Sequence, residues 1–187
     1  MKKSELKKYA LSAMFLAIGL VLPLLTGQIP KFGKMLLPMH IPVILCGMIC
    51  GWEKGFIVGL ILPLLRSVIF GVPTLYPDAV SMTFELAAYG AVSGFIYSRF
   101  PTQTLKSIYA SLLGAMISGR IAMAVAKIIL LSISANGYTF AAFLSGALIN
   151  AAPGLVIQLI LIPLIMVALY KAKLIPLSDD TKKSTER

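Results

Sequence analysis

Six long apolar segments, separated by short polar breaks, occupy almost the whole chain. They cover about residues 9–25, 35–51, 55–70, 78–97, 108–133 and 140–170. A helix needs roughly 20 mainly apolar residues to cross a bilayer. Charged residues make up only 13% of the chain, whereas a soluble domain has about a quarter. The sequence therefore predicts an all-α integral membrane bundle of six transmembrane helices over residues 1–172, followed by a polar tail at 173–187.

The basic residues predict how this bundle lies in the membrane. Six spans place both termini on one side, where twelve Lys and Arg residues fall, against only Lys31 and Lys34 on the other side. Because cytoplasmic loops carry the excess of Lys and Arg, we expect both termini in the cytoplasm, with a tight turn at residues 52–54 on that side. The net charge of +10 thus comes largely from basic residues that flank the spans at the cell membrane, where they can contact anionic lipid. No nucleic-acid partner is expected.

A few polar residues interrupt the apolar segments, where an ionisable side chain costs about 2.5–3.5 kcal/mol or more on insertion scales. They come from five different segments and are His40, Arg66, Glu85, Arg120, Lys127 and Asn150. In the predicted topology they all lie in the outer half of the membrane or near its midplane, and the inner half has little that is comparable except Gln158. A conduction path needs polar lining on both sides, so this pattern predicts a pocket that opens outward.

Most of these residues also have a purely structural explanation. Arg66 and Glu85 can neutralise each other as a buried pair. His40 can be a helix-start residue at the membrane interface. Lys127 can extend to the outer surface, and Asn150 can hydrogen-bond between helices. These alternatives stay open from the sequence alone.

Arg120 is the hardest of the set to explain structurally, because it lies deep in its segment between small residues. The group contains three permanent cations and the single carboxylate of Glu85, so an anionic ligand is expected. Arg66 or Arg120 would hold it by a bidentate contact, with tyrosines as aromatic walls. The predicted substrate-binding residues are His40, Arg66, Tyr76, Glu85, Tyr89, Arg120 and Asn150.

Several protein classes are disfavoured by motifs that the sequence lacks. It contains no G-x-x-x-x-G-K-[ST] phosphate loop, and its one histidine excludes an HExxH metal site. One intramembrane carboxylate provides no acid pair for hydrolysis, so neither an enzyme nor a metal or cofactor is expected. A stand-alone proton-coupled carrier that uses Glu85 is an alternative, although no inverted repeat is evident. A structural subunit whose polar groups join helices is a third interpretation.

Small residues spaced four apart recur along the chain, as in Gly55 and Gly59 or Gly90 and Gly94. Such spacing allows close approach of helix backbones, and packing within the bundle is the simplest role for each pair. Ala13 and Ala17 form a similar pair in the first segment, within the motif AxxAMFLA that follows a basic head. A second feature is the block LPMHIPVILCGMICGWEKGFIVGLILPLLRS at residues 37–67.

Over residues 5–172 these features resemble the substrate-binding S components of energy-coupling factor (ECF) vitamin transporters. The resemblance implies that the chain captures a vitamin outside the cell and docks through Ala13 and Ala17 on a transmembrane coupling T subunit. It further implies two ATPase subunits and toppling of the S component in the membrane. Substrate does not transfer with fold. The excess of cations favours pantothenate, while pyridoxine or hydroxymethylpyrimidine, alpha-ribazole, niacin and lipoate stay open.

Overall fold

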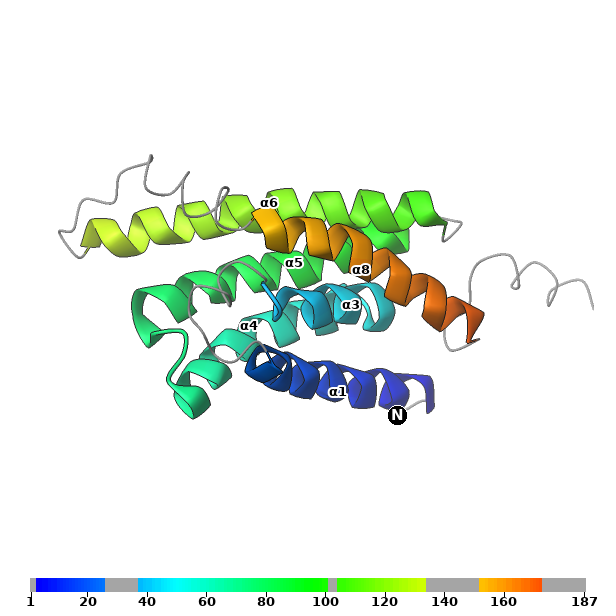
Figure 1. Ribbon diagram of the computed structural model, residues 1–187, viewed down its shortest axis with the longest axis horizontal. Helices are drawn as coiled ribbons and strands as arrows, with labels where there is room; N and C mark the ends of the chain where they lie inside the picture. The colour runs from blue at the N-terminus through cyan, green and yellow to red at the C-terminus, as the bar shows by residue number, and fades with distance from the viewer. Residues whose placement is uncertain (1–2, 26–36, 101–103, 134–151, 173–187) are drawn as a thin grey trace, which may run out of the picture.

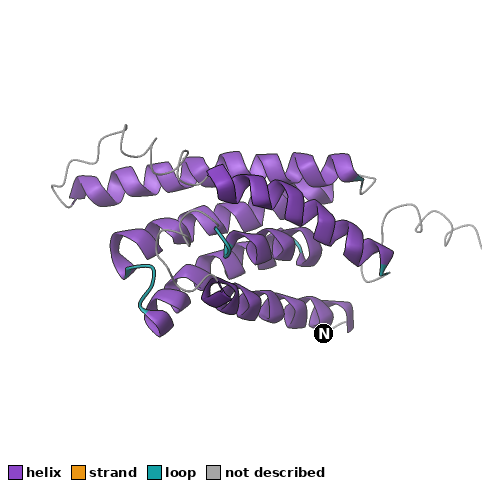
Figure 2. Cartoon of the chain, viewed as in Figure 1, coloured by secondary structure: helices purple, strands orange, loops and turns teal. Residues whose placement is uncertain are grey.

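The computed structural model describes residues 3–25, 37–100, 104–133 and 152–172, and these parts of the chain are helical with short connections (Figure 2). The elements are α1 (Lys3–Leu25), α3 (His40–Cys50), α4 (Trp52–Phe70), the π-helical turn η1 (Leu75–Ala79), α5 (Val80–Arg99), α6 (Leu105–Ile133) and α8 (Ala152–Lys171). Four helical segments are long and apolar enough to cross a membrane: α1, η1 with α5, α6 and α8. The prediction of an all-α membrane bundle is confirmed.

The helices lie side by side in three layers. Figure 1 shows α1 along one side of the bundle, α6 and α8 along the opposite side, and α3, α4 and α5 between them. Helix α5 packs against α4, α6 and α3, whereas α1 packs against α3 and α4. Helix α8 contacts α6 and α3. Helix α1 begins at the end of the bundle where α8 ends (Figure 1).

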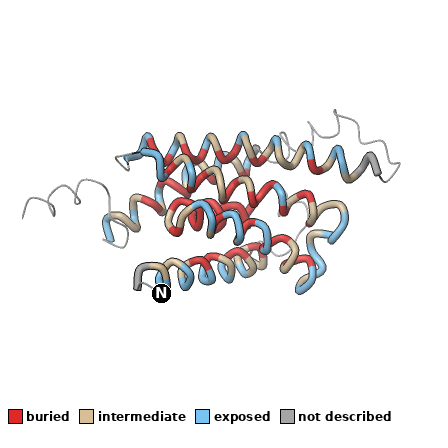
Figure 3. Tube along the Cα trace, turned by 180° about the vertical axis from the view of Figure 1, so that it is seen from behind, coloured by how far each residue is buried: buried red, intermediate tan, exposed pale blue. Residues whose placement is uncertain are grey.

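Burial is concentrated on the central helices (Figure 3). Every residue of α3 except Ile49 is buried. Large apolar side chains on the outer helices are exposed, among them Ile18, Ile117 and Ile160. An apolar surface of this extent is unusual for a soluble monomer, and in a membrane bundle it faces lipid.

Glycines bring the three central helices into direct backbone contact. A Cβ atom at Gly55 would collide with the Cα atom of Gly47 on α3 and the carbonyl oxygen of Gly90 on α5. A Cβ atom at Gly59 would collide with the backbone of Leu86. The expectation that the glycine pairs of α4 and α5 pack within the bundle is confirmed. This packing holds α3, which carries His40, close to α5, which carries Glu85.

The turn between α3 and α4 differs from the predicted one. Residues 52–54 form the first turn of α4, and the chain reverses at Gly51, where φ is +102°. Glycine adopts positive φ without a Cβ clash, so one residue is sufficient for the reversal. Gly71, with φ of +69°, ends α4, where the sequence predicts a break.

Helix boundaries also differ from the predicted segments. Helix α3 begins at His40 rather than near residue 35, because Pro38 supplies no N–H group and disfavours helical geometry in the preceding Leu37, whose φ is +49°. Helix α1 extends back into the basic head as far as Lys3. Residues 140–151 of the last predicted segment and the predicted tail at 173–187 lie outside the described residues.

Candidate functional site

A buried carboxylate joins three helices at the centre of the bundle. Glu85 on α5 is 1% exposed, and its Oε1 atom lies 3.1 Å from Nη1 of Arg120 on α6. The same oxygen lies 3.4 Å from Nε2 of His40, the first residue of α3. A buried carboxylate is tolerated when a charge of opposite sign lies beside it, and α6 places the Arg120 guanidinium there. We call His40, Glu85, Tyr89 and Arg120 the central cluster.

Tyr89 completes the central cluster one turn along α5 from Glu85. Its fully buried ring meets the His40 ring edge to face, with centroids 4.9 Å apart and an interplanar angle of 88°. On its other side the ring packs against the backbone of α6, since a Cβ atom added at Gly119 would collide with it. Gly119 is therefore required for the close approach of α6 that places Arg120 beside Glu85.

The central cluster retains polar atoms without partners. His40 Nδ1, Tyr89 Oη and Arg120 Nε and Nη2 are buried and make no hydrogen bond within the described part of the chain. Buried polar groups nearly always have partners. Nε and Nη2 together form the side-on edge of a guanidinium, whose two donors match a carboxylate. The arrangement thus offers a planar anion a bidentate site.

Arg66, which the sequence predicts as a substrate-binding residue or a partner of Glu85, contacts α1 instead. Arg66 is 3% exposed, and its guanidinium donates a hydrogen bond from Nη1 to the carbonyl oxygen of Leu20 on α1, at 3.0 Å. It also lies over the Phe70 ring, 5.4 Å from the centroid. The considered pair between Arg66 and Glu85 is therefore not formed, because Arg66 projects from the face of α4 that meets α1. The structure assigns Arg66 to the attachment of α1.

Two further contacts connect η1 to the C-terminal half of α6. Lys127 Nζ lies 3.5 Å from Asp78 Oδ1, and the Tyr76 hydroxyl donates a hydrogen bond to the carbonyl oxygen of Leu130. Lys127 is 15% exposed and paired, rather than extended to the outer surface. Tyr76 is 48% exposed and lies at the edge of the bundle. Its hydroxyl contacts α6 at Leu130, whereas the sequence predicts Tyr76 as an aromatic wall of the binding site.

One predicted site residue is not described by the structure, and two polar residues outside the predicted set lie within the bundle. Asn150 lies outside the described residues. Asp78 was missed because it follows a proline-rich break, although its spacing of seven residues from Glu85 matches that of Lys127 from Arg120. Gln158 on α8 is fully buried, and neither polar atom of its amide has a hydrogen-bond partner among the described residues.

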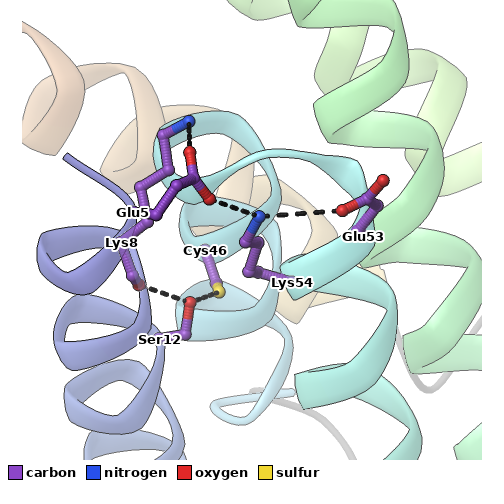
Figure 4. A network of polar contacts seen from close by, with 6 residues as sticks. All are labelled: Glu5, Lys8, Ser12, Cys46, Glu53 and Lys54. Atoms are coloured by element: carbon purple, nitrogen blue, oxygen red, sulfur yellow. Dashed lines mark hydrogen bonds and ion pairs between the residues drawn. The ribbon is translucent and has the colours of Figure 1, made fainter. Parts of the chain in front are cut away.

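A second polar network lies at the opposite end of the bundle, where α1 begins (Figure 4). Glu5 contacts Lys8 at 3.0 Å and Lys54, at the start of α4, at 3.2 Å. Ser12 donates to the carbonyl oxygen of Lys8 at 2.8 Å and accepts from Cys46 Sγ on α3 at 3.6 Å. This network holds the first half of α1 against α3 and α4.

The side of α1 away from this network carries the predicted docking pair. Ala13 and Ala17 are both exposed, as are Ala10, Met14 and Ile18 around them. The alternative that these alanines pack against another span does not agree with this placement for the described helices. Their contact with a partner subunit remains a prediction.

Comparison with known proteins agrees with this architecture. The model of the family described as ECF transporter, substrate-specific component, matches residues 7–166, from the first helix to within α8. No curated protein and no solved structure matches the chain. Since the family match covers most of its length, the chain belongs to the family of substrate-specific components of ECF transporters.

Proposed function

We propose that this S component captures a small water-soluble vitamin at the central cluster, from the outer side of the cell membrane. One observation carries the proposal: the side-on edge of the Arg120 guanidinium is buried and without a partner, while its Nη1 atom contacts Glu85. Glu85 neutralises the arginine before substrate arrives and fixes its orientation. A substrate carboxylate would then bind Nε and Nη2.

The energetics favour such a ligand. A buried charge that lacks hydrogen bonds is costly, so a group that satisfies both donors recovers part of that cost on binding. A charge-assisted hydrogen bond contributes about 1.5–3 kcal/mol. Glu85 balances the charge of Arg120, so the ligand's carboxylate would be held by the hydrogen-bond donors that Arg120 leaves unused, and its polar groups would meet His40 and Tyr89.

Pantothenate is the leading candidate, because it combines a carboxylate for Arg120 with hydroxyl and amide groups. Those groups suit His40 Nδ1 and Tyr89 Oη, which are buried and make no hydrogen bond within the described part of the chain. Pyridoxine or hydroxymethylpyrimidine is the alternative, since a neutral ring would use the same two side chains and leave the arginine edge without a carboxylate.

Delivery would use the exposed face of α1. We propose that Ala13 and Ala17 meet a transmembrane T subunit that works with two ATPase subunits. Small side chains there permit close helix approach, and the network of Glu5 with Lys54 holds α1 in position on the body of the S component. Both termini would lie in the cytoplasm, in accord with the basic residues near them.

A stand-alone proton-coupled carrier is a second candidate, favoured by the contact between Glu85 and His40. Coexpression with T and ATPase subunits distinguishes the two proposals. The S component should copurify with those subunits and support uptake only in their presence. Uptake by this chain alone, driven by a proton gradient, would establish the carrier instead.

Binding measurements test the substrate side of the proposal. The full chain, purified in lipid nanodiscs, is titrated with pantothenate and with panthenol, which carries an alcohol in place of the carboxylate. Pantothenate should bind about tenfold more tightly or better, because each 1.4 kcal/mol corresponds to about tenfold. Equal affinities would overturn the assignment of the carboxylate to Arg120.

A further inference from the structure

Two ion pairs connect the same two parts of the bundle. The inner pair is Glu85 with Arg120 at 3.1 Å, and the outer pair is Asp78 with Lys127 at 3.5 Å. The two acids are seven residues apart in sequence, and so are the two bases. Seven residues are close to two helical turns, about 10 Å along the axis. Lys127 therefore lies on the same face of α6 as Arg120, on the outward side of it.

The two pairs differ in their access to solvent. The carboxylate of Asp78 is 28% exposed, whereas that of Glu85 is 1% exposed. A ligand that arrives from the outer side can thus reach the outer pair before the inner one. A hydrogen bond from Tyr76 to Leu130 also joins the η1 turn that carries Asp78 to α6. The outer pair is therefore held in position on the outward side of the central cluster.

We propose that Lys127 is an outer subsite, which first attracts the anionic group that Arg120 finally binds. This inference rests on the proposed function. Asp78 holds the lysine ammonium in place and neutralises it until the substrate carboxylate displaces it. Lys presents a compact, strongly hydrated charge on a flexible stem, which suits a transient contact, while the planar fork of Arg suits the final one.

A purely structural role for the outer pair makes a different prediction. If Asp78 and Lys127 only fasten η1 to α6, removal of either partner releases the same contact and changes binding kinetics in the same direction. In the outer subsite the two residues act in opposite ways. Lys127 attracts the carboxylate and Asp78 competes with it, so the two substitutions have effects of opposite sign on the association rate.

The experiment measures association and dissociation rates on the full chain in nanodiscs of uncharged lipid. Pantothenate, nicotinate and lipoate are the probes, and the one that wild type binds most tightly is used. At low ionic strength Lys127→Met should slow association roughly threefold to tenfold, and Asp78→Asn should speed it, within the range seen among variants of one site. Dissociation rates should change little, because the final contacts are those of Arg120.

Three controls accompany these variants. Lys127→Arg keeps the charge and should associate nearly as wild type does. Lys106→Met removes an exposed lysine from the other end of α6 and should have no effect. The differences should shrink as salt rises, since the Debye length falls from about 30 Å at 0.01 M to about 8 Å at 0.15 M. If panthenol binds, its association rate should be insensitive to all of these variants.

The results distinguish failure of the outer subsite from failure of the proposed function. A bound carboxylate whose association rate changes in the same direction in Lys127→Met and Asp78→Asn would overturn the outer subsite and leave the proposed function standing. An unchanged association rate in both variants would do the same. Failure of wild type to bind any of the three carboxylates would overturn the proposed function and the subsite together.

Discussion

Arg120 and Glu85 meet through one nitrogen and one oxygen, 3.1 Å apart. An arginine that serves only as a structural counter-ion commonly pairs with a carboxylate through two parallel hydrogen bonds. Here the edge with two suitable donors, Nε and Nη2, is buried and makes no hydrogen bond within the described helices. Arg120 can therefore hold a ligand through this edge while Nη1 stays beside Glu85.

Replacement of Arg120 by lysine should separate charge from shape. Arg120→Lys keeps the positive charge and loses the planar fork. Loss of one charge-assisted hydrogen bond, about 1.5–3 kcal/mol, should weaken pantothenate binding about tenfold or more, as measured by titration of the purified protein. Arg120→Ala should weaken it further. Lys106→Ala changes an exposed residue near the start of α6 and should leave the affinity near that of wild type; an equal loss there would count against the assignment.

Neutralisation of Glu85 should destabilise the protein before any ligand is added. Glu85→Gln leaves the Arg120 charge buried without its counter-charge, and breaking a buried pair costs about 3–5 kcal/mol. The midpoint of thermal unfolding in detergent should therefore fall. The double variant Glu85→Gln with Arg120→Gln removes both charges and should recover part of the loss. Additive losses in the double variant would show that the two side chains do not act as a pair.

Two glycines on α6 offer a matched comparison of packing. Gly119→Ala places a methyl group against the Tyr89 ring and near the Glu85 carbonyl oxygen, whereas the close clash of Gly114→Ala is with the flexible end of the Ile96 side chain alone. Overpacking typically costs about 1–3 kcal/mol, so Gly119→Ala should lower both thermal stability and ligand affinity. Gly114→Ala should have a smaller effect, because the Ile96 end can move. Equal effects would argue against close packing at Tyr89.

A double substitution on α1 should separate capture from coupling. Ala13→Trp with Ala17→Trp adds bulk to an exposed face of α1 and leaves the central cluster untouched. Isolated protein should bind its vitamin normally, while copurification with T and ATPase subunits and uptake in cells should be lost. Loss of binding with retained assembly would contradict both the docking assignment and a packing role for these alanines.

The sequence predicts the helices and the depth of the polar residues better than it predicts their partners. Apolar runs of sufficient length locate the spans, and the positions of His40, Glu85 and Arg120 along them place these residues near one level. Which residues meet depends on the rotation of each helix about its axis, where neighbouring residues point about 100° apart. The rotation of α4 turns Arg66 toward Leu20, a contact that charge alone does not indicate.

Local backbone chemistry explains the other differences. The reversal at Gly51 requires a positive φ that the apolar pattern does not reveal. Asp78 directly follows a proline-rich break, at the very start of the fourth predicted segment, yet its spacing from Glu85 repeats that between Arg120 and Lys127. That repeated spacing of seven residues could have indicated two ion pairs between the same elements.

Mass spectrometry of small molecules retained by the purified protein shows whether Arg120 holds a carboxylate ligand. Wild type and Arg120→Gln are expressed and purified in parallel, and their bound molecules are extracted and compared. Wild type should retain a vitamin with a carboxylate, pantothenate first among the candidates, and the variant should have lost it. A neutral molecule retained equally by both proteins would contradict this role of Arg120.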